Sequence, residues 1–330
     1  MNIDFLVDRI RLTVDNHKLS QEGTYARYRR IENGKVYLSA FNEYGCADAA
    51  NIRYTIGEMP IKEERQACIK VLQHFQDVET GMFKEESHVM LHGTAHCIAA
   101  LELFDEKPIY PMNGLDAYRS VEGLYDLLEG LDWQGLEGSG HMGAGVFAAM
   151  LLSGGASAEW QNAYFSWLDR NVDSKYGIGR LGAVDAGIRP KWHHLNDWFH
   201  FLFNYWFVRR PFPCAEKLID TCIDLYCSHE LKETFGTTCD YSEIDWVFAL
   251  NRATWQTGHR FGESRKVLKD FAEFYIAHLE QIDIETNADW NDLHLLFGTV
   301  CALAELQLAL PGVLETKYPL RQVLDRRPFI

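Results

Sequence analysis

Two kinds of apolar segment alternate along the chain. Segments of the first kind carry apolar residues three or four positions apart with charged residues between them, as in EERQACIKVLQHFQD (63–77) and ESRKVLKDFAEFYIAHLEQI (263–282). This period predicts amphipathic helices that bury one face. Similar segments start near residues 3, 114, 157 and 213. The pattern therefore predicts six outer helices that expose one face to solvent.

Segments of the second kind are apolar on nearly every side. HMGAGVFAAMLLSGG (141–155) and LHLLFGTVCALAELQLALPG (293–312) are the clearest, and others begin near residues 46, 93, 196 and 243. A helix without a polar face is enclosed by other helices, so these segments predict six inner helices. Their opening polar residues recur every 45 to 56 positions, an interval typical of a helical array. These markers are Asp48, His96, His141, Asp197, Asp245 and His294.

The alternation resembles the six-hairpin α/α toroid superfamily, which includes six-hairpin glycosidases, toroid polysaccharide lyases and terpenoid-cyclase-like toroids. The loops QDVETGMF (76–83) and NVDSKYGIGR (171–180) are similar too, since both place Asp and then Gly ahead of an inner helix. The resemblance implies one all-α domain, residues 1–330, folded as an (α/α)6 barrel of six outer and six inner helices. It also implies that the inner helices begin at one common mouth. A turn at 32–35 predicts one small hairpin.

The composition limits which classes of partner the protein can bind. The 330 residues carry a net charge of −15, and Lys and Arg are scattered, which disfavours nucleic acid and anionic membranes. No segment approaches the roughly 18 apolar residues of a spanning helix, and the N-terminus lacks an apolar signal core. Eight cysteines without a CxxC pair indicate a reducing compartment. We expect a cytoplasmic protein, alone or as a homo-oligomer, whose partner is a small molecule or an oligosaccharide.

Histidines gather where the inner helices begin. Asp, Asn, Ser and Thr are favoured helix caps, so capping accounts for many of the carboxylates there. Histidine is not a favoured cap, yet five of the 13 histidines lie at or just before inner-helix starts. We expect these side chains to surround a central cavity at the mouth of the barrel. They are His92, His96, His141, His194 and His294.

The segment TTCDYSEIDWVFALNRATWQTGHR (237–260) has the strongest catalytic pattern. Asp240, Tyr241 and Asp245 lie close together at a helix start. Two carboxyl groups in different environments are what glycosidic chemistry requires, one as acid and one as base or nucleophile. A capped helix start with solvated acids is the structural alternative. We select Asp240, Asp245, Tyr241 and His194 as candidate catalytic residues.

Other polar and aromatic residues are candidates for substrate binding. In RPKWHHLNDWFHFLFNYW (189–206), His193, Asp197 and His200 share a helix face, and Trp192 is placed to stack on a sugar ring. In ADWNDLHLLFG (288–298), a cap at Asp289 or Asn291 is the structural alternative. The predicted substrate-binding residues are Asp48, His92, His96, His141, Trp192, His193, Asp197, Arg252, Trp290 and His294.

The run His88, His92, His96 has the four-residue spacing that can chelate zinc on a helix, with His141 or Asp240 as a conceivable third ligand. Gly93 interrupts the run, and the chain lacks a recognised zinc spacing. We therefore expect His92 and His96 to act as hydrogen-bond donors, with no metal and no cofactor.

Four functions remain open. The leading hypothesis is a carbohydrate-active enzyme that hydrolyses a glycoside by general acid/base catalysis. The second is a uronide lyase or isomerase in which Tyr241 or Tyr205 acts with His193 or His194, and Arg252 or Arg260 neutralises the substrate carboxylate. A terpenoid-cyclase-like enzyme is the third, although the chain has no DDxxD or DxDD run. A non-enzymatic binding toroid is the fourth.

Overall fold

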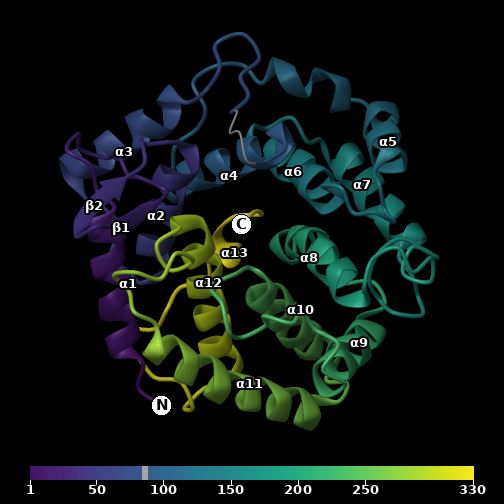
Figure 1. Cartoon of the computed structure of the whole chain (residues 1–330). Coiled ribbons are helices and arrows are strands. Elements are labelled where there is room, and N and C mark those ends of the chain that lie inside the picture. The colour runs from purple at the N-terminus through teal and green to yellow at the C-terminus, as the bar shows by residue number, and fades with distance from the viewer. Residues whose placement is uncertain (84–87) are drawn as a thin grey trace.

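The computed structural model describes residues 1–83 and 88–330, and these residues form a mostly helical protein, which confirms the all-α prediction. Six helices, which we call the inner helices, surround the centre of the molecule (Figure 1). Each packs against the next, and α12 packs against α2, so their order of contact is closed. The inner helices are α2 (Glu43–Thr55), α4 (Met90–Leu103), α6 (Ser139–Leu152), α8 (Lys191–Phe207), α10 (Ser242–Thr257) and α12 (Leu293–Ala309).

Burial on all sides explains why these segments are apolar all round. In α12, Leu296, Phe297 and Ala302 are fully buried although their positions point in three different directions around the helix axis. Small residues allow the helices to approach closely. A Cβ atom on Gly145 of α6 would lie 2.8 Å from the carbonyl oxygen of Leu91 in α4, so only glycine fits there without a backbone shift.

The remaining long helices lie at the periphery (Figure 1). In the longest, α11, the buried residues Leu268, Phe271, Tyr275 and Leu279 follow a spacing of three or four, as the sequence predicts. The segment expected to start near residue 114 is two elements, a short 3-10 helix and then α5. These peripheral elements are α1 (Asp4–Asn16), α3 (Lys62–His74), η1 (Asn113–Tyr118), α5 (Val121–Gly130), α7 (Ala158–Asn171), α9 (Ala215–Cys227) and α11 (Phe261–Gln281).

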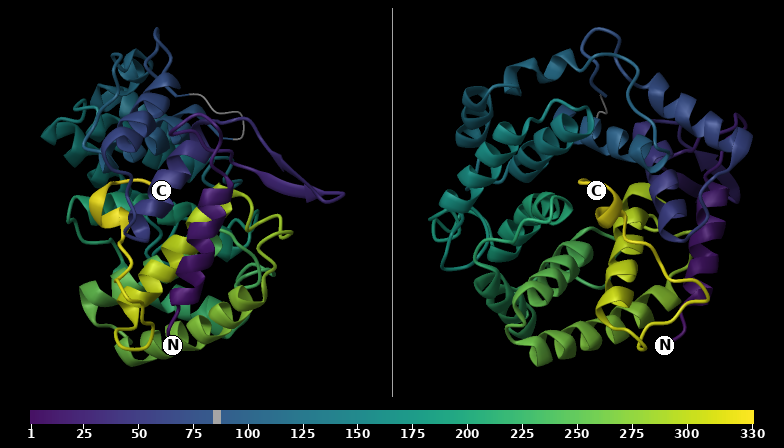
Figure 2. Two further views of the ribbon diagram at one scale, coloured as in Figure 1. Left: turned by 90° about the vertical axis from the view of Figure 1, so that its left-hand side faces the viewer. Right: turned by 180° about the vertical axis from the view of Figure 1, so that it is seen from behind.

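The predicted hairpin is present and projects from the body of the molecule (Figure 2). Strands β1 (Arg29–Glu32) and β2 (Lys35–Leu38) pair antiparallel, with Glu32 opposite Lys35. Asn33 and Gly34 both have positive φ, at 51° and 73°, as a two-residue turn of this kind requires.

The last residues of the chain lie inside the ring (Figure 1). After the short helix α13 (Val323–Arg326), Phe329 and Ile330 are buried. The Phe329 ring lies 4.9 Å from the His92 ring and 5.5 Å from that of Phe203, centroid to centroid. Within the described ranges, no helix has both the length and the apolar character needed to cross a bilayer.

Candidate functional site

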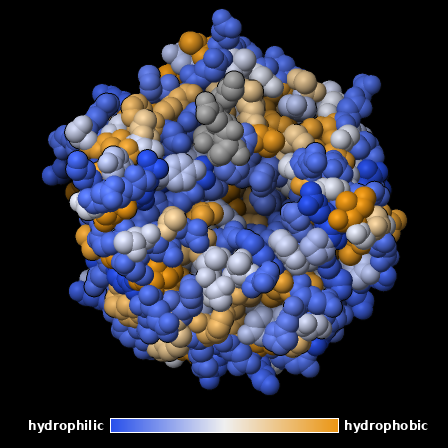
Figure 3. Space-filling model, in the orientation of Figure 1, coloured by the Kyte–Doolittle hydropathy of each residue, from blue (hydrophilic) through white to orange (hydrophobic). Residues whose placement is uncertain are grey.

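A pocket of about 420 Å³ opens where the inner helices begin. The face shown in Figure 3 is mostly hydrophilic and is hollowed near its centre, inside the ring of Figure 1. Side chains from α4, α6, α8, α10 and α12, most of them near the helix starts, line the pocket, which brings together residues far apart in sequence. The predicted residues among them are His92, His141, Trp192, His193, Asp197, Asp240, Tyr241, Asp245 and His294.

Asp245 presents a buried carboxyl group in this pocket. Its side chain is 3% exposed, and its Oδ1 has no hydrogen-bond partner among the described residues. Burial, reinforced by the neighbouring carboxyl groups of Asp240 and Glu243, holds the pKa of Asp245 well above its usual range. The N-cap position of α10 is Tyr241, so Asp245 is not the helix cap, and its carboxyl group keeps its proton more readily than an exposed aspartate.

Asp240 has a different environment. It forms an ion pair with Lys232, from the loop before α10, and its Oδ1 accepts the backbone N–H of Tyr241 (2.6 Å). Glu243 faces the same loop, where it accepts the backbone N–H of Gly236 (2.7 Å), and burial raises its pKa to about 7. The start of α10 thus brings a buried carboxyl group and an ion-paired carboxylate to one pocket.

A hydrogen-bonded chain lies beside these acids. The Tyr241 hydroxyl lies 3.0 Å from His294 Nδ1, which is also 3.1 Å from Asp48 Oδ2. Asp48 Oδ1 accepts from His96 Nε2 (2.8 Å). Burial alone would raise the pKa of Asp48, but His294 and His96 lower it below its ordinary value, and burial lowers the pKa of His96. Asp48 and His96 are buried and do not line the pocket. They therefore orient the His294 side chain and do not contact a ligand themselves.

Three histidines from successive inner helices form a second cluster. His92, His141 and His200 each offer a ring nitrogen, and these three atoms all lie within 4.8 Å of one another, a grouping that can hold a metal ion. Burial is the main cause that holds the pKa of His92 and His141 well below the usual range and lowers the pKa of His200 to about 4. The rings are therefore neutral at pH 7.

Asp197 and Trp192 reach the pocket from the start of α8. Asp197 Oδ1 accepts the Ser139 hydroxyl (2.9 Å) and the Gly140 backbone N–H (2.6 Å), so it fastens the start of α6. Burial raises the pKa of Asp197 to about 6. Trp192 is partly exposed and stacks on His193, with ring centroids 5.0 Å apart. Its position agrees with the predicted cavity position.

Besides Asp48 and His96, three predicted site residues do not line this pocket. His194 points into the protein and is fully buried. Trp290 is also fully buried, and its indole N–H donates to Thr13 (2.7 Å). Arg252 is 1% exposed and forms a buried ion pair with Glu305 (2.6 Å). The structure therefore places these three side chains outside the pocket that the other predicted residues share.

The structure also corrects one cap and adds residues that the sequence pattern does not select. The cap of α12 is Asp292, whose carboxylate accepts the His294 N–H (2.9 Å), in place of Asp289 or Asn291. The pocket-lining residues outside the predicted set include Arg27, His88, Asn196, His200, Lys232 and Ser242. Of these, His88 belongs to the run of histidines spaced by four, and His200 shares a helix face with His193 and Asp197; the other four carry no sequence signal.

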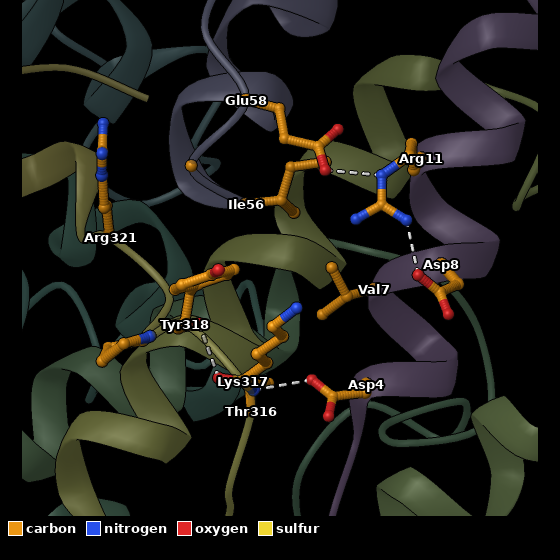
Figure 4. A pocket seen from close by; sticks show the side chains of 12 residues that line it. Asp4, Val7, Asp8, Arg11, Ile56, Glu58, Thr316, Lys317, Tyr318 and Arg321 are labelled. Carbon is orange, nitrogen blue, oxygen red and sulfur yellow. Dashed lines mark hydrogen bonds and ion pairs between the residues drawn. The ribbon is translucent and has the colours of Figure 1, made fainter.

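A larger cavity of about 870 Å³ lies between α1 and residues 316–321 (Figure 4). Two of its three acidic side chains pair with Arg11. Arg11 contacts Asp8 and Glu58 at 2.5 Å each, and Asp4 accepts a backbone N–H of the 316–321 segment (2.8 Å). Among the described residues, no histidine lines it. Despite its size, it lacks the convergent titratable groups of the smaller pocket.

No protein-family model, curated protein or solved structure matches this chain. The geometry of the smaller pocket is therefore what bears on its chemistry. It belongs to an all-α protein whose inner helices bring carboxyl, imidazole and phenol groups to one cavity.

Proposed function

We propose that the chain is an (α/α)6 toroid enzyme that hydrolyses a carbohydrate or glycoside in this pocket by general acid/base catalysis. The closed order of contact among the inner helices supports the toroid. One observation supports the reaction more than any other. Asp245, a buried carboxyl group with a raised pKa, lines the same pocket as Asp240, a carboxylate paired with Lys232.

The two carboxyl groups suit the two halves of glycoside hydrolysis. Asp245 donates its proton to the oxygen of the leaving group as the glycosidic bond breaks, a step that needs a carboxyl group still protonated at neutral pH. Asp240 accepts a proton from the water that adds to the sugar carbon. One water is consumed, and the products together exceed the substrate by its mass.

The rest of the pocket matches such a substrate. Its volume of about 420 Å³ falls in the usual range of small-molecule sites, about 300 to 1,000 Å³. Trp192 offers an aromatic ring at the rim, and His193 and Asn196 offer polar groups to hydroxyls. Large aromatic rings beside a few polar groups are typical of sites that fix a ligand's orientation.

Product masses test the proposal directly. The full-length protein is incubated with a panel of oligosaccharides and aryl glycosides, and the products are weighed by mass spectrometry. Hydrolysis predicts products that sum to the substrate plus one water. We expect Asp245→Asn and Asp240→Asn each to lower kcat/KM by about 10²- to 10⁴-fold with little change in Tm. Asp289→Asn, near the start of α12 but outside the pocket, is the matched control and should retain activity.

The chain Tyr241–His294–Asp48 favours one alternative, an elimination or isomerisation. Asp48 accepts the proton of His294 Nδ1, which leaves Nε2 as the basic atom of the ring, and the Tyr241 phenol lies 3.0 Å from the same Nδ1. In this case the active pair is Tyr241 with His294. The hydroxyl of Tyr205 donates to Asp169 (2.7 Å), away from the pocket. Products that sum to the substrate mass, with new ultraviolet absorbance, would favour elimination and refute hydrolysis.

A further inference from the structure

The three-histidine cluster, His92, His141 and His200, has no part in the acid/base scheme above. The three side chains come from α4, α6 and α8, which are consecutive neighbours in the ring. Their ring centroids are 4.4 Å apart for His92 and His141 and 4.8 Å apart for His141 and His200. Three separate helices therefore deliver one imidazole each to the same wall of the pocket.

Hydrogen bonds orient two of the three rings. His200 Nδ1 donates to the backbone carbonyl of Asn196 (3.0 Å), which fixes its neutral tautomer and leaves the Nε2 lone pair free to bind. His92 Nδ1 lies 2.5 Å from the Tyr44 hydroxyl, so its Nε2 is likewise the atom left for a ligand. Metal-ligating histidines characteristically use their second ring nitrogen in this way.

The other candidate cluster is already occupied by its own hydrogen bonds. In Asp48, His96 and His294, the carboxylate accepts from both imidazoles, at 2.8 and 3.1 Å. A cation there would have to replace these bonds. In the three-histidine cluster, no carboxylate of residues 1–83 or 88–330 forms a hydrogen bond with the nitrogens that face one another.

We propose that His92, His141 and His200 form a binding site for a divalent transition-metal ion of the zinc class, with its open coordination position facing the pocket. All three residues line the pocket, so a bound water or a substrate hydroxyl or carbonyl oxygen completes the coordination. Three imidazoles suit Zn²⁺, Co²⁺ or Ni²⁺, whereas Mg²⁺ and Ca²⁺ require oxygen ligands.

Binding needs only a local adjustment. Nitrogen ligands about 2.1 Å from a tetrahedral ion are roughly 3.4 Å apart, somewhat closer than the 4.8 Å limit observed here. His141 and His200 are partly exposed, so their rings can rotate toward the ion without disturbing the core. Asp240 and Asp197 line the same pocket and supply negative charge nearby.

The test uses the full-length protein with Co²⁺ and Zn²⁺ as probes and no substrate. The metal-free protein is titrated with Co²⁺ and followed by its visible d–d absorption. Zinc is counted by mass spectrometry after equilibrium dialysis. We expect about one ion per chain, displacement of Co²⁺ by Zn²⁺, and no competition from Mg²⁺ or Ca²⁺.

His141→Ala and, independently, His200→Ala should each lose the cobalt spectrum and most of the bound zinc, with circular dichroism unchanged. The matched control is His193→Ala, which removes a histidine of the same pocket outside the cluster and should keep full stoichiometry. Tyr44→Phe removes the hydroxyl that orients His92 and should weaken zinc binding about 10- to 100-fold. A wild-type protein that binds no ion, or equal binding by His141→Ala and His193→Ala, would overturn the proposal.

The result is separable from the proposed hydrolysis. Asp245→Asn should bind metal like the wild type although it is inactive, since Asp245 is not a ligand. Metal binding without hydrolysis on the substrate panel would refute only the proposed function. Hydrolysis by a protein that binds no metal would refute only the metal site.

Discussion

His194 supplies a sensitive test of how burial sets charge in this protein. It is fully buried in α8, and neither ring nitrogen has a hydrogen-bond partner among the described residues. Burial is the main cause that lowers the pKa of His194 from 6.5 to about 4. The folded protein therefore resists protonation of this ring, whereas the unfolded chain accepts a proton as the pH falls below about 6.5.

The sign and size of the effect follow from proton linkage. Because the pKa of His194 is lower in the folded state, its contribution to stability is full above pH 6.5 and is lost as the pH falls toward 4. The difference between a pKa of 6.5 in the unfolded chain and about 4 in the folded protein corresponds to about 3 kcal/mol of stability. Between pH 7 and pH 5, the free energy of unfolding should fall by about 2 kcal/mol from this residue alone.

His194→Leu isolates that contribution, since leucine fills a similar volume and does not titrate. Urea unfolding followed by tryptophan fluorescence at pH 7 and pH 5 gives the free energy of unfolding for both proteins. We expect the variant to lose about 2 kcal/mol less than the wild type between the two pH values. Equal losses would refute the reasoning and would mean that water or a partner reaches the ring.

Three further predictions concern other parts of the molecule. Asp48→Ala leaves two buried histidines without their shared acceptor and should lower the free energy of unfolding by about 3 to 5 kcal/mol in urea titrations; a loss below about 1 kcal/mol would contradict the buried network. Gly145→Ala places a Cβ atom against the Leu91 carbonyl and should lower the free energy of unfolding by about 1 to 3 kcal/mol. Gly130→Ala, whose Cβ atom meets open space, should leave the free energy of unfolding unchanged or raise it in the same assay. If Asp245 is the general acid, kcat should fall as the pH rises through its raised pKa, because the proton is lost; a rate profile without an alkaline limb would exclude that role.

The inner helices could be predicted from sequence because complete burial demands apolar residues on every side. The segments 141–155 and 293–312 correspond to α6 and α12, with ends displaced by up to three residues. The residue at which a helix begins is harder to predict, because a single hydrogen bond determines which of several neighbouring polar residues caps the helix. At the start of α12, Asp292 alone accepts the N–H two residues on, although Asp289 and Asn291 offer equally suitable side chains.

The candidate site could be predicted only in part. Polar residues at inner-helix starts do meet in one pocket, as the repeat implies. The sequence did not distinguish His193 from His194, because adjacent residues on a helix differ in direction by about 100° and the rotation of α8 is set by packing. His200 lies more than two turns into α8, so a rule based on helix starts misses it. Lys232 comes from a loop that carries no periodic signal.

The closed order of the inner helices has a consequence for how the protein is made. A linear helical array exposes its first and last repeats, and another copy can stack on either of them. Here α12 packs against α2, so the first and last inner helices cover each other. The seam includes the bond between Asp48 and His294, which are 246 residues apart. Contacts of such long sequence separation slow folding. Until α12 has been synthesised, the nascent chain therefore has two uncovered apolar edges, one on α2 and one on α10. These edges are the surfaces to which a chaperone would bind before α12 closes the ring.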